Sequence, residues 1–446
     1  MNWIQLPSGY TDIQQYTKDL VECINKYEWL IQNHAVDFLV SGYWHSKVPT
    51  EWHCIATEFS MHDLIQMASH FKLPDRKQWP ESLVEFVATC QSLGLPRDPP
   101  SIESKFQQAP SDLLVFSGMS VKKRLEVQIM SDCVSELCRT TDVETVVDMG
   151  AGQGYLDSLL VRSGLNVVSI DDDDIQTCGA KRRADRTSAT TGIGKWTIIN
   201  RRVALDESLD GIVEGEALGG WMLCGLHACG DLTVSVIKQF LLSDAKALCV
   251  VGCCYNAITE KTSSSGAYGF PLSTYLQDRN VHLGVCARQV ACQCTGRWGS
   301  DGLQEEEAVI NFRRHFYRAL VQKLMVERGI GDAKVGRMRS SVTKKGFSAY
   351  FHKAMDKMLG SATTHVHTDE CDPERLQRLE ADNADGEKQV SVVWTLRAML
   401  SGAIESLILV DRFMFLSQHK LDMVQLRPLF PHLDSPRNMA IIATKK

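Results

Sequence analysis

The amino-acid sequence predicts an α/β fold in which a doubly wound, mostly parallel sheet is combined with two helical regions. Short apolar runs alternate with helix-like segments in the middle of the chain, which is typical of strand–helix–strand units. Apolar residues at helical spacing fill the region before it and much of the region after it. The chain then ends in two apolar runs around a Pro/Asp/Ser turn, which predicts a closing antiparallel hairpin.

The composition is that of an ordinary folded protein and excludes one class of nucleic-acid binder. The chain has 446 residues, so two or three structural units are expected. Its net charge is −6, whereas a protein that coats nucleic acid non-specifically is usually basic, so any such contact needs a local patch. The start has no secretory pattern and the fifteen cysteines are scattered, so we expect reduced thiols in the cytoplasm and/or nucleus.

Residues 1–105 are expected to form an N-terminal helical unit. Apolar side chains recur at helical spacing in residues 11–33, 59–71 and 81–94. The three prolines of LGLPRDPP, residues 93–100, stop any regular element and indicate a linker.

Residues 106–260 are expected to form the core of the sheet. Four short apolar runs predict strands: TVVDM (145–149), NVVSI (166–170), WMLCGL (221–226) and ALCVVG (247–252). Between the first two, YLDSLLVRSG predicts a helix that is closed by Gly164. Strands that are apolar almost throughout are typical of a parallel sheet with both faces covered.

Residues 261–420 are expected to be a long helical insertion, and residues 421–446 the closing hairpin. Helical patterns cover three segments: 304–327, about 345–359 and 389–416. The polar, acid-rich stretch near 361–388 has almost no apolar periodicity, so a disordered or poorly ordered loop is expected there.

One apolar stretch, residues 392–416, raises the question of a membrane span. It contains four charged residues, and its longest uncharged run, from Ala398 to Ile404, is far below the roughly 20 residues that a span requires. We therefore expect a buried core helix and no membrane.

The segment VVDMGAGQGYLDSLL, residues 146–160, predicts a cofactor loop between a strand and a helix. Glycines at 150, 152 and 154 let backbone amides approach a ligand. Their spacing differs from the G-x-G-x-x-G of dinucleotide sites, and Asp148 would repel a pyrophosphate but attract an ammonium group. Asp171, at the end of the next strand, can accept both ribose hydroxyls. The pattern favours S-adenosylmethionine over a nicotinamide cofactor; a plain tight turn is the alternative.

DMGAGQGY followed by an acidic strand end resembles the Rossmann-type S-adenosylmethionine-dependent methyltransferases. A wider set of motifs resembles the methyltransferase-like protein 25 family, which is also labelled as carrying a ribosomal RNA adenine dimethylase domain: MSVKKRLEV (119–127), GLHACGDL (225–232), GCCYN (252–256), GFPLS (269–273) and SPRNMAIIATK (435–445). The segment His227-Ala228-Cys229-Gly230 is similar to that of a tRNA 2′-O-methylating family. The resemblance implies a Rossmann-type methyltransferase sheet, and that a lysine near residue 123 contacts cofactor or substrate.

The expected site lies at the carboxyl ends of the strands. The predicted cofactor-binding residues are Lys123, Asp148, Gly150, Ala151, Gly152, Gly154, Asp171, Asp172 and His227, and the predicted catalytic residues are His227, Asp231 and Tyr255. The acidic run after Asp171 also suits a solvated loop. His227 or Asp231 can remove or orient a proton. The nearby cysteines at 229, 253 and 254, and at 292 and 294, suit either a metal or the filling of narrow space, and their spacing assigns no metal site.

The expected activity is methyl transfer to a macromolecule, with RNA preferred over protein. Residues 334–357 are basic and include Phe347, Tyr350 and Phe351, whose spacing is that of a buried helix stripe, so only the basic face is expected to meet RNA or a partner. A catalytically degenerate cofactor-binding scaffold, or a partner-binding protein, is the alternative, and a nicotinamide oxidoreductase is less favoured. The sequence does not give the oligomeric state.

Overall fold

The computed structural model describes residues 2–75, 78–99, 116, 118–187, 194–204, 207–216, 220–261, 268–329, 335–359 and 372–446. The chain divides into two compact units, which we treat separately. The sheet unit comprises Met1–Lys18, Leu95–Cys292 and Glu405–Lys446, and the helical unit comprises Asp19–Gly94 and Gln293–Ile404. This division differs from the predicted boundaries, because most of the N-terminal helices and the middle of the insertion form one unit instead of two.

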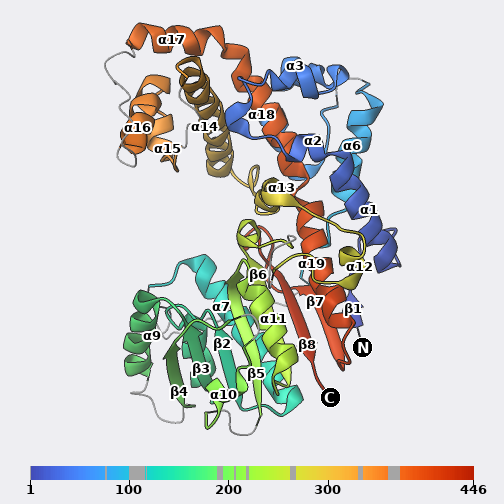
Figure 1. The fold of residues 1–446 in the computed structure, drawn as a ribbon, viewed down its shortest axis with the longest axis vertical. Coiled ribbons are helices and arrows are strands. Elements are labelled where there is room, and N and C mark those ends of the chain that lie inside the picture. The colour runs from blue at the N-terminus through green and yellow to red at the C-terminus, as the bar shows by residue number, and fades with distance from the viewer. Residues whose placement is uncertain are drawn as a thin grey trace. The chain divides into compact units, whose positions relative to one another are not determined.

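The sheet unit is built on eight strands in the order β1-β7-β8-β6-β5-β2-β3-β4 (Figure 1). The strands are β1 (Asn2–Ile4), β2 (Thr145–Met149), β3 (Asn166–Asp171), β4 (Trp196–Asn200), β5 (Trp221–Cys229), β6 (Ala247–Cys253), β7 (Met423–Pro428) and β8 (Met439–Thr444). β8 is antiparallel to both of its neighbours, and every other pair is parallel. The predicted fold class is therefore confirmed: a doubly wound parallel sheet that ends in an antiparallel hairpin.

Helices cover both faces of this sheet. The helices of the sheet unit outside α1 (Ile13–Lys26) and α19 (Ser401–Ser417) are α7 (Val121–Thr141), α8 (Tyr155–Arg162), α9 (Asp174–Thr187), α10 (Asp210–Val213), α11 (Leu232–Leu242), α12 (Thr274–Gln277) and α13 (Gly284–Val290). α7 and α8 bury apolar side chains against one face of the central strands, while α11 packs against β5 and β6 from the other (Figure 1). The strands β2 and β6 are buried at every position, which explains their continuous apolar sequence.

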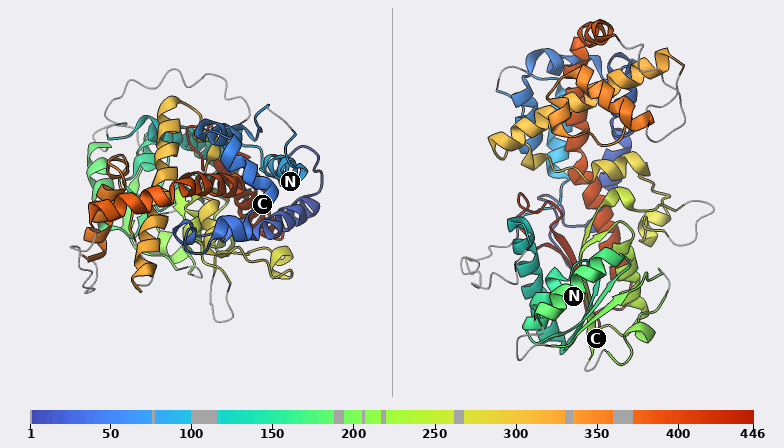
Figure 2. Two further views of the ribbon diagram at one scale, coloured as in Figure 1. Left: turned by 90° about the horizontal axis from the view of Figure 1, so that it is seen from above. Right: turned by 90° about the vertical axis from the view of Figure 1, so that its left-hand side faces the viewer.

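The first strand was not predicted, and it brings the two chain ends together. β1 is three residues long and pairs in parallel with β7 at the edge of the sheet. The N- and C-termini lie near each other at this side of the sheet in each view (Figures 1 and 2). Its sequence, NWI, is too short to show a strand period.

The helical unit confirms the predicted helices and the predicted aromatic core. Its helices are α2 (Glu28–Ile31), α3 (Tyr43–Lys47), α4 (Cys54–Glu58), α5 (Met61–His70), α6 (Glu81–Ser92), α14 (Gly302–Glu327), α15 (Ser340–Thr343), α16 (Phe347–Leu359), α17 (Pro373–Asp382) and α18 (Ala384–Met399). The division between the units falls within α1 (Ile13–Lys26) and α19 (Ser401–Ser417). Phe347, Tyr350 and Phe351 of α16 are buried against α14, where the first two pack on the ring of Tyr317.

The expectation of a disordered loop near 361–388 is wrong for residues 373–388, which form α17 and the start of α18. Asp372 accepts a hydrogen bond from the Glu374 amide, Pro373 begins the helix, and Leu376 is buried. One buried leucine and a cap give no apolar period, which is why the sequence suggested disorder. Residues 361–371 lie outside the described part of the chain.

The apolar stretch near residue 400 consists of two helices, α18 and α19, and not one. The segment Ala384–Ser417 is long and apolar enough to cross a membrane by length and composition, but 89% of its most apolar window is buried inside the protein. Asp411 and Arg412 are buried within it. These features are those of a core helix of a folded protein.

Candidate active site

The loop between β2 and α8 can only be built from glycine at its alternate positions. Gly150, Gly152 and Gly154 have φ values of +75°, +58° and +68°. A Cβ on Gly154 would lie 2.5 Å from the ring of Trp196, and one on Gly150 would lie 2.7 Å from Leu232. The left-handed backbone at all three positions, with close packing at Gly150 and Gly154, therefore favours glycine.

Asp148, at the end of β2, is buried and shares a hydrogen bond with a second buried carboxyl group, Asp157 of α8. Burial raises the pKa of both groups, and the pKa of Asp157 is raised well above its ordinary value because the charge of Asp148 adds to burial. Asp157 also accepts a hydrogen bond from Ser169. Apart from the hydrogen bond that the two carboxyl groups share, the Oδ1 atoms of Asp148 and Asp157 accept none from any described residue. The pair is therefore a buried acidic group that a cationic ligand can stabilise.

Asp171, at the end of β3, ties the glycine loop to the neighbouring strand. Its Oδ2 accepts from the Gly152 amide at 2.9 Å, and its Oδ1 accepts from the Asp173 amide at 2.9 Å. Each carboxylate oxygen can accept a second hydrogen bond, so Asp171 still has acceptors for a diol. Asp172 is exposed, and the Ala151 amide donates to the Ile170 carbonyl.

His227 lies at a bulge in β5 and is oriented by a buried carboxylate. Its φ is +66°, and the pairing of β5 with β6 shifts between Leu226 and Ala228. Its Nε2 lies 3.0 Å from Oε2 of Glu126 in α7, and Ser435 donates to Oε1 of Glu126 at 2.6 Å. Burial raises the pKa of Glu126, but the hydrogen bond and charge of His227, with the hydrogen bond of Ser435 and the charge of Lys122, outweigh it and lower the pKa to about 2.

Glu126 was missed by the sequence reasoning, although it lies inside the quoted motif MSVKKRLEV. Three motifs that are far apart in the chain meet at its carboxylate. Lys122 lies 3.5 Å from it. Lys123, the predicted cofactor contact, is partly buried: burial lowers its pKa, while the charges of Glu126 and Asp148 raise it. Lys123 therefore lies within electrostatic reach of Asp148, as its predicted role requires.

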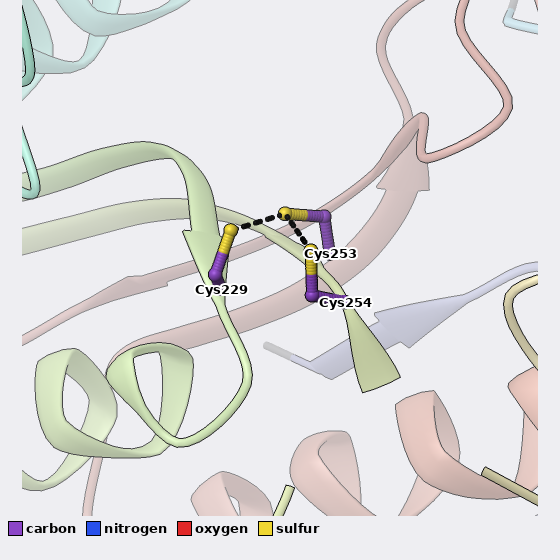
Figure 3. Close-up of side chains that lie close together, drawn as sticks. All are labelled: Cys229, Cys253 and Cys254. Carbon is purple, nitrogen blue, oxygen red and sulfur yellow. Dashed lines mark hydrogen bonds between the residues drawn. The ribbon is translucent and has the colours of Figure 1, made fainter. Parts of the chain in front are cut away.

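Three cysteine thiols gather where β5 and β6 end (Figure 3). The Sγ of Cys229 lies 3.0 Å from that of Cys253, which lies 3.6 Å from that of Cys254. The hydrogen bond from Cys253, followed by one from Cys254 and the charge of His227, outweighs burial and lowers the pKa of Cys229 to about 6. The structure does not bring Cys292 or Cys294 into this cluster: Cys292 instead donates to the side chain of Asn256.

Two of the three predicted catalytic residues are held in structural contacts. Asp231 accepts from the amide of Thr259 at 2.9 Å and from its hydroxyl at 2.7 Å. Tyr255 is 1% exposed and donates to Glu405 at 2.9 Å. Burial raises the pKa of Tyr255. The geometry does not support acid–base work by these two groups, whereas the His227 side chain is 26% exposed.

Parts of the chain are similar to known proteins. Residues 122–261 match a family model described as a methyltransferase domain. The chain is 29% identical over 284 residues to probable methyltransferase-like protein 25 of Homo sapiens, and 30% identical over 285 residues to that of Mus musculus. Each match covers 60% of this chain, but only 43% of the human and 44% of the mouse protein, so the chain spans less than half the length of these relatives.

Solved methyltransferases also match, at low structural similarity. Coclaurine N-methyltransferase bound to N-methylheliamine and SAH is 11% identical, with a TM-score of 0.27, over 89% of this chain and 98% of that one. Magnesium protoporphyrin IX methyltransferase from Synechocystis with bound SAH is 18% identical, with a TM-score of 0.23, over 34% of this chain and 66% of that one. Scores this low do not bear on the activity. Residues 122–261, which carry the glycine loop, therefore match a methyltransferase-domain model, and the chain is similar to the proteins named probable methyltransferase-like protein 25.

Proposed function

We propose that this protein transfers a methyl group from S-adenosylmethionine to a macromolecular acceptor. The observation that carries the proposal is the pair Asp148 and Asp171, which flank the glycine loop at the carboxyl ends of two adjacent strands. These residues fit the cofactor. The buried carboxyl pair of Asp148 and Asp157, whose Oδ1 atoms accept no hydrogen bond from any other described residue, suits an ammonium group, and the open acceptors of Asp171 suit the ribose hydroxyls. A cofactor without phosphate explains why buried carboxyl groups line this loop.

When bound, S-adenosylmethionine supplies an electrophilic methyl group. Asp148 and the loop from Gly150 to Gly154 would hold the amino-acid end, with Lys123 near enough to interact with its carboxylate. Asp171 would fix the ribose. Positioning of this kind supplies much of the rate of a displacement between two bound groups.

His227 is the residue best placed to accept a proton from the acceptor group. Because the pKa of Glu126 is about 2, its carboxylate is ionised at neutral pH and Nε2 of His227 must donate to it. In the neutral ring, Nδ1 then carries the lone pair and is the only nitrogen that can take a proton. Glu126 thus fixes the tautomer of His227 in the way that a general base requires.

RNA is the preferred acceptor class, and the support is a basic surface on the helical unit. Six exposed basic side chains lie in the described residues 335–357: Arg337, Arg339, Lys344, Lys345, Lys353 and Lys357. Glu306 pairs with Lys344 at 2.7 Å and Asp356 with Lys353 at 3.4 Å, so the surface is only partly neutralised. The aromatics of this segment are buried, so it is suited to phosphates and not to base stacking. Lys334 lies outside the described residues.

Cytoplasm and/or nucleus remains the proposed location. All fourteen cysteines among the described residues are free thiols, which is typical of a reducing compartment.

The test is transfer of a labelled methyl group from S-adenosylmethionine into total RNA and total protein from cells that lack this protein. We expect label in RNA with the wild type and none with His227→Ala. The matched control is Glu136→Ala, an exposed position on α7 with no contact to the site residues among those described, which is expected to leave transfer unchanged. Label in protein but not in RNA would overturn the acceptor class.

A binding-only scaffold is the second candidate, because Asp231 and Tyr255 are both engaged in structural hydrogen bonds. It predicts cofactor binding without label in either RNA or protein. A scaffold also predicts that the His227→Ala variant keeps every cellular role of the protein. If the protein is an enzyme, this variant loses the roles that depend on methyl transfer.

A further inference from the structure

The three thiols at the ends of β5 and β6 form a compact cluster that methyl transfer does not require. The Sγ atoms of Cys229, Cys253 and Cys254 all lie within 4.8 Å of one another. All three point into the same space from two neighbouring strand ends (Figure 3). Seven of the fourteen cysteines among the described residues are buried, whereas Cys229 and Cys254 are exposed.

The backbone is arranged so that the third thiol joins the other two. Cys229 and Cys253 are register partners in β5 and β6, so their side chains lie on the same face of the sheet. Consecutive residues of a strand point to opposite faces, so Cys254 would normally point away. Instead Cys254 adopts a left-handed conformation with φ of +49°, which a non-glycine residue adopts at a cost of about 1 kcal/mol or more.

Hydrogen bonds hold this turn in place. The amide of Gly230 donates to the carbonyl of Cys253 at 3.1 Å, and the amide of Ala257 donates to the carbonyl of Cys254 at 2.9 Å. Unfavourable backbone conformations that are retained in this way concentrate at ligand sites. The left-handed conformation of Cys254 places its sulfur beside those of Cys229 and Cys253, so that three thiols lie together instead of two.

We infer that Cys229, Cys253 and Cys254 bind a zinc ion through three thiolates, with a fourth coordination position left open. Thiolates are preferred zinc ligands, and a tetrahedral site with Zn–S distances near 2.3 Å places its sulfurs about 3.8 Å apart. The measured separations of 3.0 Å and 3.6 Å reach that value with small side-chain rotations. Within the described residues no fourth histidine, cysteine or carboxylate lies in the cluster, since Nε2 of His227 contacts Glu126.

The charge of the cluster can be balanced. Each thiol that binds zinc releases its proton to solvent. Three thiolates and one Zn²⁺ carry a net charge of −1. Lys123 lies close enough for its charge to interact with Cys253. A cation can enter from solvent, because Cys229 and Cys254 are exposed.

The open coordination position would allow the zinc ion to take part in a reaction. A zinc ion with three protein ligands can bind a water or a substrate atom in the fourth position. The cluster lies at the carboxyl ends of β5 and β6, so if the proposed function holds, the ion would bind the acceptor atom beside His227. This use rests on the proposed function, whereas zinc binding itself does not.

The experiment is a measurement of zinc in the full-length protein, purified with a reductant, loaded with zinc and dialysed. We expect about one zinc ion per chain, and at least a tenfold loss in Cys254→Ser and in Cys229→Ser. The control is Cys178→Ser, an exposed cysteine of α9 outside the cluster, which is expected to keep its zinc. Near-ultraviolet circular dichroism checks that each variant is folded.

Cobalt substitution gives a second readout that does not depend on activity. Co²⁺ in the wild type is expected to show thiolate-to-metal charge-transfer absorption, which Cys254→Ser loses. A zinc-free wild type, full zinc in Cys254→Ser, or a Cys229–Cys253 disulfide in the freshly purified protein would overturn the inference. Zinc content is measured separately from cofactor binding, so zinc in a protein that binds no S-adenosylmethionine would contradict the proposed function and leave this inference intact.

Discussion

Removing the carboxylate of Glu126 is expected to loosen the contact between α7 and the end of β5. Glu126 is 2% exposed and accepts hydrogen bonds from His227 and Ser435. Lowering its pKa from 4.5 to about 2 corresponds to about 3 kcal/mol of stabilisation at neutral pH. Two hydrogen bonds to a charged group, each contributing about 1.5–3 kcal/mol, give a similar figure. We expect Glu126→Ala to lose about 3 kcal/mol and Glu126→Gln about 1 kcal/mol, because glutamine can accept from His227 and donate to Ser435.

The assay is hydrogen–deuterium exchange of peptides from α7 and β5, which reports local opening in a chain of two compact units. A loss of about 3 kcal/mol corresponds to roughly hundredfold faster exchange. The control is Glu136→Ala, an exposed position on the same helix. Because the folded-state pKa of Glu126 lies below its ordinary value, its contribution is present above pH 4.5 and is lost as the pH falls toward 2. Exchange in Glu126→Ala within threefold of Glu136→Ala would refute the reasoning.

Three further predictions concern the loop and the buried charges. Gly154→Ala places a Cβ 2.5 Å from Trp196 at a positive φ, so it should cost about 2 kcal/mol or more in unfolding free energy and abolish cofactor binding, measured by thermal unfolding and calorimetry. Asp157→Asn removes a carboxyl group whose pKa is raised. Wild-type stability should therefore rise relative to the variant from pH 7 to pH 5, by at most about 1.4 kcal/mol per pH unit in chemical denaturation. Arg412→Met replaces a buried guanidinium that donates to no described residue, so the melting temperature should stay the same or rise; a fall of several degrees would show an unrecognised partner.

The sheet and the cofactor loop could be predicted from sequence because their signals are local. Four strands were apolar over most of their length, and the glycine spacing with Asp148 and Asp171 lies within 24 residues of chain, from 148 to 171. The predicted helix over 389–416 was correct in type but is interrupted at Leu400, two residues before Gly402, and the apolar period continues across the break.

The parts that could not be predicted depend on contacts between distant residues. Glu126 lies in a charged helix start, and only its contacts with His227 and Ser435, 101 and 309 residues away, distinguish it from a surface acid. The hydroxyl of Tyr255 donates its hydrogen bond to Glu405, which lies 150 residues further along the chain. The helical unit combines residues 19–94 with residues 293–404, which lie before and after most of the sheet region in the sequence. Such long-range packing leaves no local signal in the sequence.

The measurement that tests the central claim most directly is calorimetric titration of the full chain with S-adenosylmethionine and S-adenosylhomocysteine. The account predicts saturable binding of both by the wild type and by the surface control Glu136→Ala, and at least a tenfold weaker affinity in Asp148→Ala and Asp171→Ala. Asp148→Asn, which keeps the shape but not the charge, should also weaken binding, because the buried acceptor is expected to face an ammonium group. A folded wild type that binds neither compound, or variants at 148 and 171 that bind as tightly as the wild type, would contradict it.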